Sequence, residues 1–214
     1  MKVLVVAGVP FELGAMPRRA WEGVTFGVAG PGRGRAIRLS SLLKAERPDA
    51  VLGVGFCGAL LEGIPPLQVA VPEAVGDGRL WLPLDPEALG LGRLKDGLLV
   101  SVPHVVATRE EKAELGRRTG AIFVDMESFW WCRAAQREGV PFAVLRVVLD
   151  GANDPLPVWR RPATLVRLPS LARSAYAARR RLQDLVLSVL HALAAEPRAG
   201  GGRPRRAREG ADLN

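Results

Sequence analysis

The sequence predicts an α/β fold, a single domain in which helices flank a central sheet that is mixed but mostly parallel. Short apolar runs alternate along the chain with segments of helical periodicity, as expected for strand–helix–strand units. The run at 142–149 is almost continuously apolar, which is typical of a parallel strand buried on both faces. With 214 residues, 48% of them hydrophobic, the chain is long enough to bury one full core.

The N-terminal part predicts two strands and a helix. Residues 1–7 form the first predicted strand, and a loop at its carboxyl end carries Glu12. A glycine-rich turn at 30–36 connects the second strand to a helix at 35–47. Backbone N–H groups in such a turn can bind an anion, with Arg33 adding positive charge. A tight turn with solvated arginines explains the same residues equally well.

The middle of the chain predicts further strands and one clearly capped helix. The third strand leads into Gly55-Phe-Cys-Gly58, where the glycines should expose backbone at the edge of the sheet. Thr108 and Glu111 have the spacing of a capping box, so a helix should run from there to residue 118. Residues 75–95 are expected to be mostly loop. The strands are predicted at 24–29, 50–54, 68–74 and 98–102.

Acidic residues follow predicted strands in both halves of the chain. A short predicted strand at 121–124 leads to Glu127, which opens a helix, and Asp150 directly follows the apolar run at 142–149. The carboxyl ends of parallel strands form the ligand-binding edge of an open α/β sheet. We therefore expect Glu12, Glu127 and Asp150 to meet at one edge.

Three carboxylates at one edge suggest acid–base chemistry on a bound small molecule. A partly buried carboxyl has a raised pKa and can protonate a leaving group at neutral pH, a role that suits Asp150. A carboxylate just before a helix, as Glu127 is, can accept two hydrogen bonds from a vicinal diol. No Ser, Cys or His has the partners of a catalytic triad. His104 and His191 lack the spacing of metal ligands, so no metal site is expected.

Charge and cysteine content narrow the class of protein. The net charge is +8, but residues 160–214 alone carry 12 Arg against 4 acidic residues, so the remainder is neutral and no nucleic-acid partner is expected. Cys57 and Cys132 lie in apolar contexts far apart, which predicts reduced thiols in a cytoplasmic protein. No apolar run approaches the roughly 18 residues of a membrane span. Nor does the start of the chain resemble a signal peptide.

The C-terminal part of the chain is basic and helical in pattern. Residues 170–193 have apolar side chains at near-helical spacing, with arginines between them. We expect a helix packed on the sheet, and the alternative is peripheral contact with a membrane through this basic helix. Residues 196–214 have few apolar side chains and should form a disordered basic tail. The domain is thus expected to span 1–195, with 155–195 as its basic amphipathic part.

Two motifs resemble the signature of the purine nucleoside phosphorylase and nucleosidase superfamily. They are Val-Asp-Met-Glu-Ser at 124–128 and Val-Pro-Phe-Ala-Val-Leu-Arg-Val-Val-Leu-Asp at 140–150. Within that superfamily the chain is most similar to the hopanoid-associated phosphorylase branch, which has a comparable Val-Ala-Thr-x-x-x-Lys-Ala, here at 106–113. The resemblance implies a nucleoside phosphorylase-like fold and cleavage of the N-ribosidic bond of a purine nucleoside, with adenine as the base. The branch implies a lipid nucleoside similar to adenosylhopane.

The resemblance also implies roles for single residues. Glu127 would bind the ribose hydroxyls, Met126 would pack on the sugar, and Asp150 would protonate the base. Glu12 falls where the nucleosidases place the glutamate that activates water. The other expected substrate contacts are Gly55, Phe56, Val106 and Arg33.

The chain departs from the family pattern in two places. Leu149 stands where a Ser often precedes the catalytic Asp, so Asp150 is expected to lack a hydrogen-bond partner. Bacterial phosphorylases bind phosphate through an Arg and a Ser at positions that correspond to Gly53 and Phe56. That difference weakens the case for phosphorolysis. Arg33 is the residue to consider as a replacement for the phosphate-binding arginine.

Several functions are compatible with these motifs. Phosphorolysis and hydrolysis are both open, so inorganic phosphate is a candidate co-substrate, and no other cofactor is expected. Alternative substrates are methylthioadenosine, S-adenosylhomocysteine and futalosine. Rivals from other classes are a nucleoside-binding protein without catalysis and a nucleic-acid-binding protein that uses the arginine-rich tail. The superfamily implies a homo-oligomer.

Overall fold

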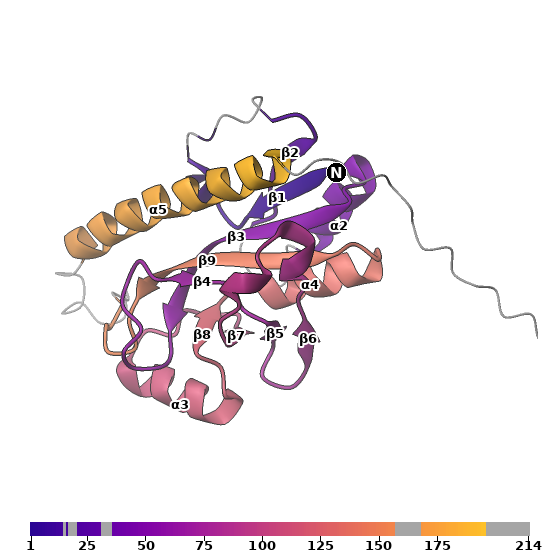
Figure 1. Ribbon diagram of the computed structural model, residues 1–214. Helices are drawn as coiled ribbons and strands as arrows, with labels where there is room; N and C mark the ends of the chain where they lie inside the picture. Colours follow the sequence, from indigo (N-terminus) through magenta and orange to yellow (C-terminus); the bar gives the residue numbers. More distant parts are fainter. Residues whose placement is uncertain (15, 17–20, 31–35, 157–167, 196–214) are drawn as a thin grey trace, which may run out of the picture.

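The computed structural model describes residues 1–14, 16, 21–30, 36–156 and 168–195. In this part of the chain, nine strands form one mixed sheet with helices packed on both faces (Figure 1). The strands are β1 (Val3–Ala7), β2 (Val24–Val28), β3 (Ala50–Ala59), β4 (Val69–Ala70), β5 (Ala74–Gly76), β6 (Trp81–Pro83), β7 (Leu98–Ser101), β8 (Phe123–Asp125) and β9 (Phe142–Asp150). The helices are α1 (Pro10–Leu13), α2 (Ala36–Glu46), α3 (Arg109–Thr119), α4 (Ser128–Arg137) and α5 (Leu168–Ala195), with short 3-10 helices η2 (Pro86–Leu89) and η3 (Gly92–Leu94).

Most strand pairs in the sheet are parallel. The strand order is β2-β1-β3-β8-β7-β5-β6, and β9 pairs with both β3 and β4. The pairs β1–β2, β1–β3, β3–β9, β5–β7 and β7–β8 are parallel, whereas β3–β8, β4–β9 and β5–β6 are antiparallel. The predicted fold class, a mixed and mostly parallel sheet flanked by helices, is therefore confirmed.

The long central strand β3 splits the sheet at its carboxyl end. In its first half, at residues 51–54, β3 lies between β1 and β9, both parallel to it. At Gly58 the register with β9 shifts, and Gly58 and Ala59 also pair with β8 in the antiparallel direction. The ends of β3, β8 and β9 therefore come together around Gly58, which pairs with both β8 and β9.

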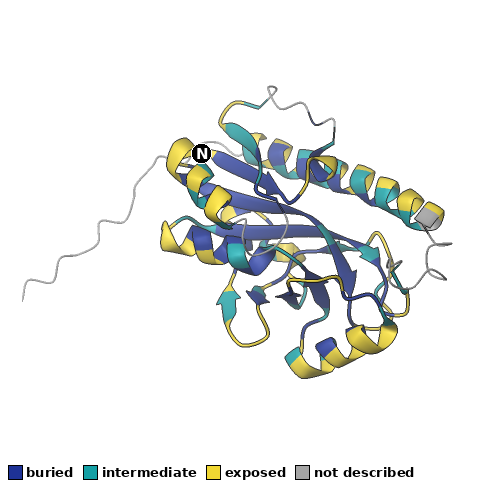
Figure 2. Ribbon diagram, turned by 180° about the vertical axis from the view of Figure 1, so that it is seen from behind, coloured by how far each residue is buried: buried dark blue, intermediate teal, exposed yellow. Residues whose placement is uncertain are grey.

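Alternating residues of the central strands pack against different helices. On one face, Leu4 and Val6 of β1 join a buried cluster with α2 and α4. On the other face, Val3 and Val5 join a second cluster with α5, which contributes Ala178, Leu182, Val186 and Leu190 at helical spacing. Burial on both faces explains why the strands are nearly continuous apolar runs (Figure 2).

Several predicted boundaries were wrong. Glu12 lies on the short helix α1 rather than in a loop, since Pro10 starts a helical turn. The third strand continues to Ala59, because pairing with β8 and β9 occupies the backbone that the glycines were expected to expose. The strand predicted at 68–74 is divided between β4 and β5, and the expected loop at 75–95 contains β6, η2 and η3.

Other predictions agree with the structure or concern residues that it does not describe. Thr108 and Glu111 form the expected capping box at the start of α3. The predicted basic amphipathic helix is α5, and it packs on the sheet. Arg33, with its glycine-rich turn, and the tail 196–214 lie outside the described residues. None of the described helices is both long and apolar enough to cross a membrane.

The packing of α5 should contribute strongly to stability. Leu182 is fully buried between α5 and the sheet, so Leu182→Ala should lower the free energy of unfolding by about 2–5 kcal/mol through lost burial and a residual cavity. Urea denaturation at equilibrium measures this change. The matched control is Leu61→Ala, where the side chain is 53% exposed and the expected loss is below about 1 kcal/mol. Equal losses in both variants would contradict the packing.

Candidate active site

Glu12 is held by backbone N–H groups at the end of β1. Its Oε2 accepts hydrogen bonds from Gly8 N at 2.8 Å and Val9 N at 3.0 Å, and its Oε1 accepts one from Phe56 N at 3.2 Å. The side chain is buried, and this burial raises the pKa of the carboxyl while the Arg146 charge and the three N–H groups oppose the rise. The bonds fix a partly desolvated carboxylate between β1 and β3.

The helix that carries Glu12 is also held from the C-terminal helix. Gln183 Nε2 of α5 donates a hydrogen bond to Leu13 O at 3.1 Å, at the end of α1. The Arg179 guanidinium lies over the Phe11 ring, 5.0 Å from its centroid. Since α1 has only four residues, these contacts with α5, together with its contacts with β1 and β3, hold it in place.

Arg146 is a buried charge in the middle of β9. Its side chain is fully buried, and it donates to Asp125 Oδ2 from Nε at 3.1 Å and from Nη2 at 2.7 Å. Nη2 also donates to Ser128 Oγ at 2.8 Å. Asp125 is in turn hydrogen-bonded to the hydroxyls of Ser101 and Ser128. This network joins β7, β8, β9 and the start of α4.

The segment between β8 and α4 presents Met126 and Glu127. Glu127 N and Ser128 N both donate to the Asp125 carboxylate, which sets the sharp turn before α4. Glu127 Oε2 lies 3.8 Å from Arg146 Nη2. Burial, together with the nearby Asp125 charge, raises the pKa of Glu127 to about 8. Glu127 is thus a carboxyl that titrates near neutral pH.

Asp150, at the end of β9, has a cationic partner that the sequence reasoning did not identify. Lys112 Nζ of α3 lies 2.5 Å from Asp150 Oδ2 and is itself fully buried. The expectation that Asp150 lacks a partner because Leu149 replaces a Ser was therefore wrong. Burial raises the pKa of Asp150, and the Lys112 charge opposes that rise.

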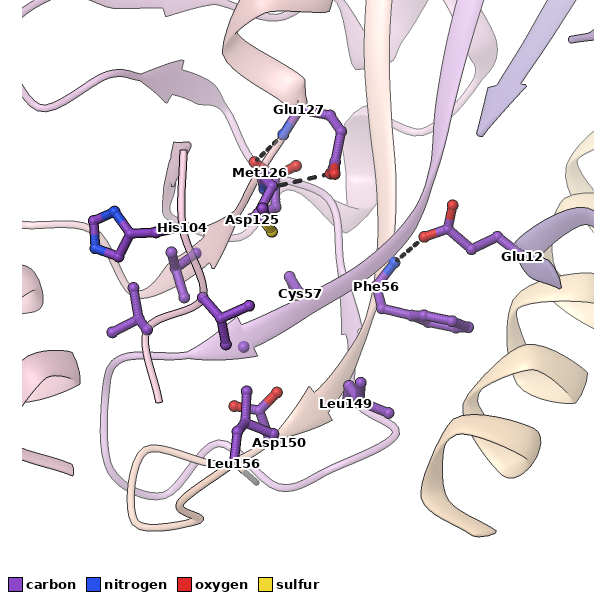
Figure 3. A pocket seen from close by; sticks show the side chains of 14 residues that line it. Glu12, Phe56, Cys57, His104, Asp125, Met126, Glu127, Leu149, Asp150 and Leu156 are labelled. Carbon is purple, nitrogen blue, oxygen red and sulfur yellow. Dashed lines mark hydrogen bonds between the residues drawn. The ribbon is translucent and has the colours of Figure 1, made fainter. Parts of the chain in front are cut away.

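The three predicted carboxylates line one cavity. Figure 3 shows Glu12, Glu127 and Asp150 on different sides of a space walled by Phe56, Cys57 and other side chains. The cavity encloses about 610 Å³ when its open mouth is included. Its lining residues are Glu12, Phe56, Cys57, Gly58, His104, Val105, Val106, Val124, Asp125, Met126, Glu127, Leu149, Asp150 and Leu156. The site is therefore acidic on several sides and apolar between them.

Most of the predicted site residues that the structure describes reach this cavity, and Gly55 does not. Met126, Phe56 and Val106 line it together with the three acids. Gly55 lies behind the wall, where a Cβ would overlap the Arg146 guanidinium and come within 2.5 Å of Glu12 Oε1. Gly55 therefore gives room to charged side chains instead of contacting a ligand. Arg33 lies outside the described residues.

Asp125, Arg146 and Lys112 were not singled out as site residues from the sequence. An arginine inside an otherwise apolar strand is a signal that could have been used, because a buried charge needs a partner. Lys112 lies three residues before Leu115 on the same face of α3, and both are buried. Its role depends on a distant part of the chain, so spacing alone did not reveal it.

Comparison with known families shows to which superfamily the chain belongs. Residues 85–191 match the phosphorylase superfamily, and this segment holds Lys112, Asp125, Glu127, Arg146 and Asp150. The match spans half of the 214 residues, so the chain belongs to the phosphorylase superfamily. No curated protein matches the chain.

Solved structures with the same fold include several nucleosidases. The 5'-methylthioadenosine/S-adenosylhomocysteine nucleosidase from S. pneumoniae, bound to a transition-state inhibitor, has a TM-score of 0.74 at 20% identity, covering 90% of this chain and 100% of that one. The S-adenosylhomocysteine nucleosidase from Streptococcus pyogenes has a TM-score of 0.74 at 16% identity, covering 90% and 97%. The Colwellia psychrerythraea nucleosidase in complex with adenine has a TM-score of 0.72 at 14% identity, covering 89% and 95%. At these identities the likeness demonstrates a shared fold.

Removing Asp125 should destabilise the protein strongly, because Arg146 would become a buried charge without its main partner. We expect Asp125→Ala to lower the free energy of unfolding by about 3–5 kcal/mol, measured by urea denaturation. The control is Glu114→Ala, which breaks the exposed ion pair with Arg117 and should cost less than about 1 kcal/mol. A loss of similar size in both variants would show that the buried pair does not hold the fold.

The titration of Glu127 should appear in the pH dependence of stability. Its pKa is about 8 in the folded protein against 4.5 as the ordinary value, so the folded state binds the extra proton between these pH values. Stability from this group is complete below pH 4.5 and is lost as pH rises through 8. The side chain of Glu127→Gln stays neutral at every pH. Between pH 5 and pH 8 the free energy of unfolding should therefore fall less in this variant than in the wild type. The difference should be at least about 1.4 kcal/mol, which corresponds to one pKa unit.

Urea titrations at both pH values measure this difference. Glu114→Gln, at an exposed position, is the control and should lose as much stability as the wild type. If Glu127→Gln also behaves like the wild type, Glu127 is ionised throughout this range.

Proposed function

We propose that this protein hydrolyses the N-ribosidic bond of an adenine nucleoside. The observation that carries the proposal is that Glu12, Glu127 and Asp150, far apart in sequence, line one cavity, with Asp150 and Glu12 both buried. Membership of the phosphorylase superfamily and the shared fold with nucleosidases support the same chemistry. The three acids fit three different tasks in this reaction.

In the proposed mechanism, Asp150 is the general acid. As the bond between C1′ and N9 breaks, its electron pair passes to the purine, and the Asp150 carboxyl gives its proton to N7 of the base. The ribose develops positive charge, which the nearby carboxylates stabilise. Glu12 takes a proton from a water molecule whose oxygen bonds to C1′. Glu127 accepts hydrogen bonds from the ribose hydroxyls, and Met126 packs on the sugar. The products are adenine and the free sugar, and no cofactor takes part.

The cavity suits water better than phosphate as the nucleophile that attacks C1′. Four acidic side chains line it, those of Glu12, Asp125, Glu127 and Asp150. Among the described residues, the two cations beside it are already paired, Arg146 with Asp125 and Lys112 with Asp150. The positions Gly53 and Phe56, which correspond to phosphate-binding residues of phosphorylases, carry no charge. A phosphate dianion would therefore find no unpaired cation among the described residues, and an ionised Glu12 would repel it.

The 5′ substituent of the nucleoside is expected to be apolar. Phe56, Leu149 and Val105 lie among the lining side chains, and Phe11 packs edge-on against Phe56 while being 42% exposed. These apolar groups suit an alkylthio or a larger apolar group better than a 5′-phosphate. Methylthioadenosine, S-adenosylhomocysteine, futalosine and a lipid nucleoside similar to adenosylhopane are the substrates to compare.

Self-association, a cytoplasmic location and membrane contact through α5 stay predictions. Light scattering after gel filtration tests for a homo-oligomer. Flotation with anionic vesicles tests the membrane contact, and recovery of the protein only in the lipid-free fraction would refute it.

The first test of the proposal asks whether water or phosphate is the attacking nucleophile. Purified protein should release adenine at the same rate with and without inorganic phosphate, and the second product should be the free sugar rather than its 1-phosphate. High-performance chromatography of adenine and a reducing-sugar assay measure both. A rate that requires phosphate would replace hydrolysis with phosphorolysis. If the protein binds the nucleosides compared here but releases adenine from none of them, it is a nucleoside-binding protein.

The second test concerns the acid. Asp150→Asn cannot donate a proton to the base, so kcat should fall by about 10² or more, the size expected for a lost general acid. The matched control is Asp184→Asn on the exposed side of α5, which should keep wild-type kcat. Adenine release by Asp150→Asn at the wild-type rate would refute the role of Asp150.

A further inference from the structure

Lys112 is a buried cation whose hydrogen bonds all go to Asp150 and the segment that follows it. Its Nζ lies 2.5 Å from Asp150 Oδ2, 2.6 Å from Gly151 O and 2.8 Å from Asp154 O. An ammonium group has three N–H donors, and here each has one acceptor. No donor is left for a bound ligand, so any influence of Lys112 on the reaction must pass through Asp150 or the segment 151–154.

The Lys112 contact determines which oxygen of Asp150 faces the substrate. Oδ2 is occupied by the ammonium and lies close to Gly58, where an added Cβ would be 3.0 Å away. Among the described residues none donates a hydrogen bond to Oδ1. Since Asp150 lines the cavity, Oδ1 is the oxygen available to the base.

Lys112 also ties the acid to one wall of the cavity. Gly151 N donates to Asp154 Oδ2 at 2.9 Å, so the turn after β9 is closed on itself, and Lys112 binds both ends of that turn. Leu156 lines the cavity, and its N donates to Ala107 O at 2.9 Å just before α3. One side chain of α3 therefore fixes both the carboxyl group and the chain leading to Leu156.

We propose that Lys112 is a positioning residue for the proton donor, which orients Asp150 through Oδ2 and takes the place of the side-chain hydroxyl that is absent at Leu149. This inference rests on the proposed function. It assigns a catalytic consequence to an ion pair that would otherwise be only structural.

Lys112 favours the reaction because charge appears on Asp150 as the proton leaves. Protonated Asp150 is neutral, and it becomes a carboxylate when its proton has passed to N7 of the purine. The ammonium then faces a full negative charge at hydrogen-bond distance, so the interaction is stronger in the transition state than before it. No proton leaves Lys112 in this step.

The charged surroundings of Asp150 give this account a pH signature. Burial raises the pKa of Asp150, Lys112 opposes the rise, and Asp154 adds to it. Cys57 of β3 also faces Asp150, and burial raises the pKa of its thiol, so it contributes no charge near neutral pH. Lys112 is therefore the cation among the described groups that keeps the pKa of Asp150 down.

The experiment compares Lys112→Met and Lys112→Arg with the wild type, using adenine release as the readout. Lys112→Met should lower kcat about tenfold at neutral pH with little change in KM. It should also move the alkaline limb of the kcat profile, where Asp150 loses its proton, upward by about one pH unit or more. Lys112→Arg keeps the charge and should keep the wild-type limb. Lys44→Met, at an exposed lysine, is the control and should match the wild type.

A double variant separates positioning from general damage to the fold. If Lys112 acts through Asp150, adding Lys112→Met to Asp150→Asn should leave kcat unchanged within about twofold. A further tenfold loss in the double variant, or an alkaline limb that stays in place in Lys112→Met, would overturn the inference. A wild-type protein that releases adenine from no nucleoside would overturn the proposed function, and the inference with it.

Discussion

The structure depends on the neutralisation of Arg146 inside the sheet. A fully buried guanidinium in a central strand needs a partner for its charge, and Asp125 supplies it. Asp125 and Ser128 accept hydrogen bonds from Nε and Nη2, whereas Nη1 has no partner among the described residues. Meeting this requirement brings the end of β8 and the start of α4 against β9. The turn that carries Met126 and Glu127 is the connection between those two elements. The geometry of the cavity therefore follows from a charge that does not itself line it.

The buried charges near the cavity are arranged in two groups. Arg146 forms an ion pair with Asp125 and lies near Glu127. Lys112 forms its ion pair with Asp150. Glu12 has no ion pair among the described residues and relies on three backbone N–H groups. In all three environments burial raises the pKa of the carboxyl group, while nearby charges and hydrogen bonds act on it in different proportions. Different chemical roles for acids of the same kind become possible in one small space.

The sequence was sufficient for the fold class and for the acids of the site. Continuous apolar runs and strand–helix alternation gave the mixed sheet, because the pattern of burial on two faces is local. Glu12, Glu127 and Asp150 were expected to meet, since each follows a predicted strand and parallel strands share an edge. The motifs at 124–128 and 140–150 pointed to the superfamily that the comparison then confirmed.

The details that the sequence did not provide come from contacts between distant segments. The extension of β3 to Ala59 depends on pairing with β8 and β9, which no local pattern encodes. Gly55 looked like a ligand contact, but it gives room to Arg146 and Glu12. The partner of Asp150 lies 38 residues earlier, on a helix in which no local pattern gave Lys112 a partner. Such a pairing becomes visible once the strands and α3 are placed in space.

The contact between α1 and α5 has a consequence for the order of folding. The hydrogen bond from Gln183 to Leu13 O joins residues that are 170 positions apart along the chain, so it closes a very long loop. The entropy of closing such a loop must be offset before the contact contributes to stability. The helix that carries Glu12 is therefore expected to dock against α5 late, after the central strands have paired.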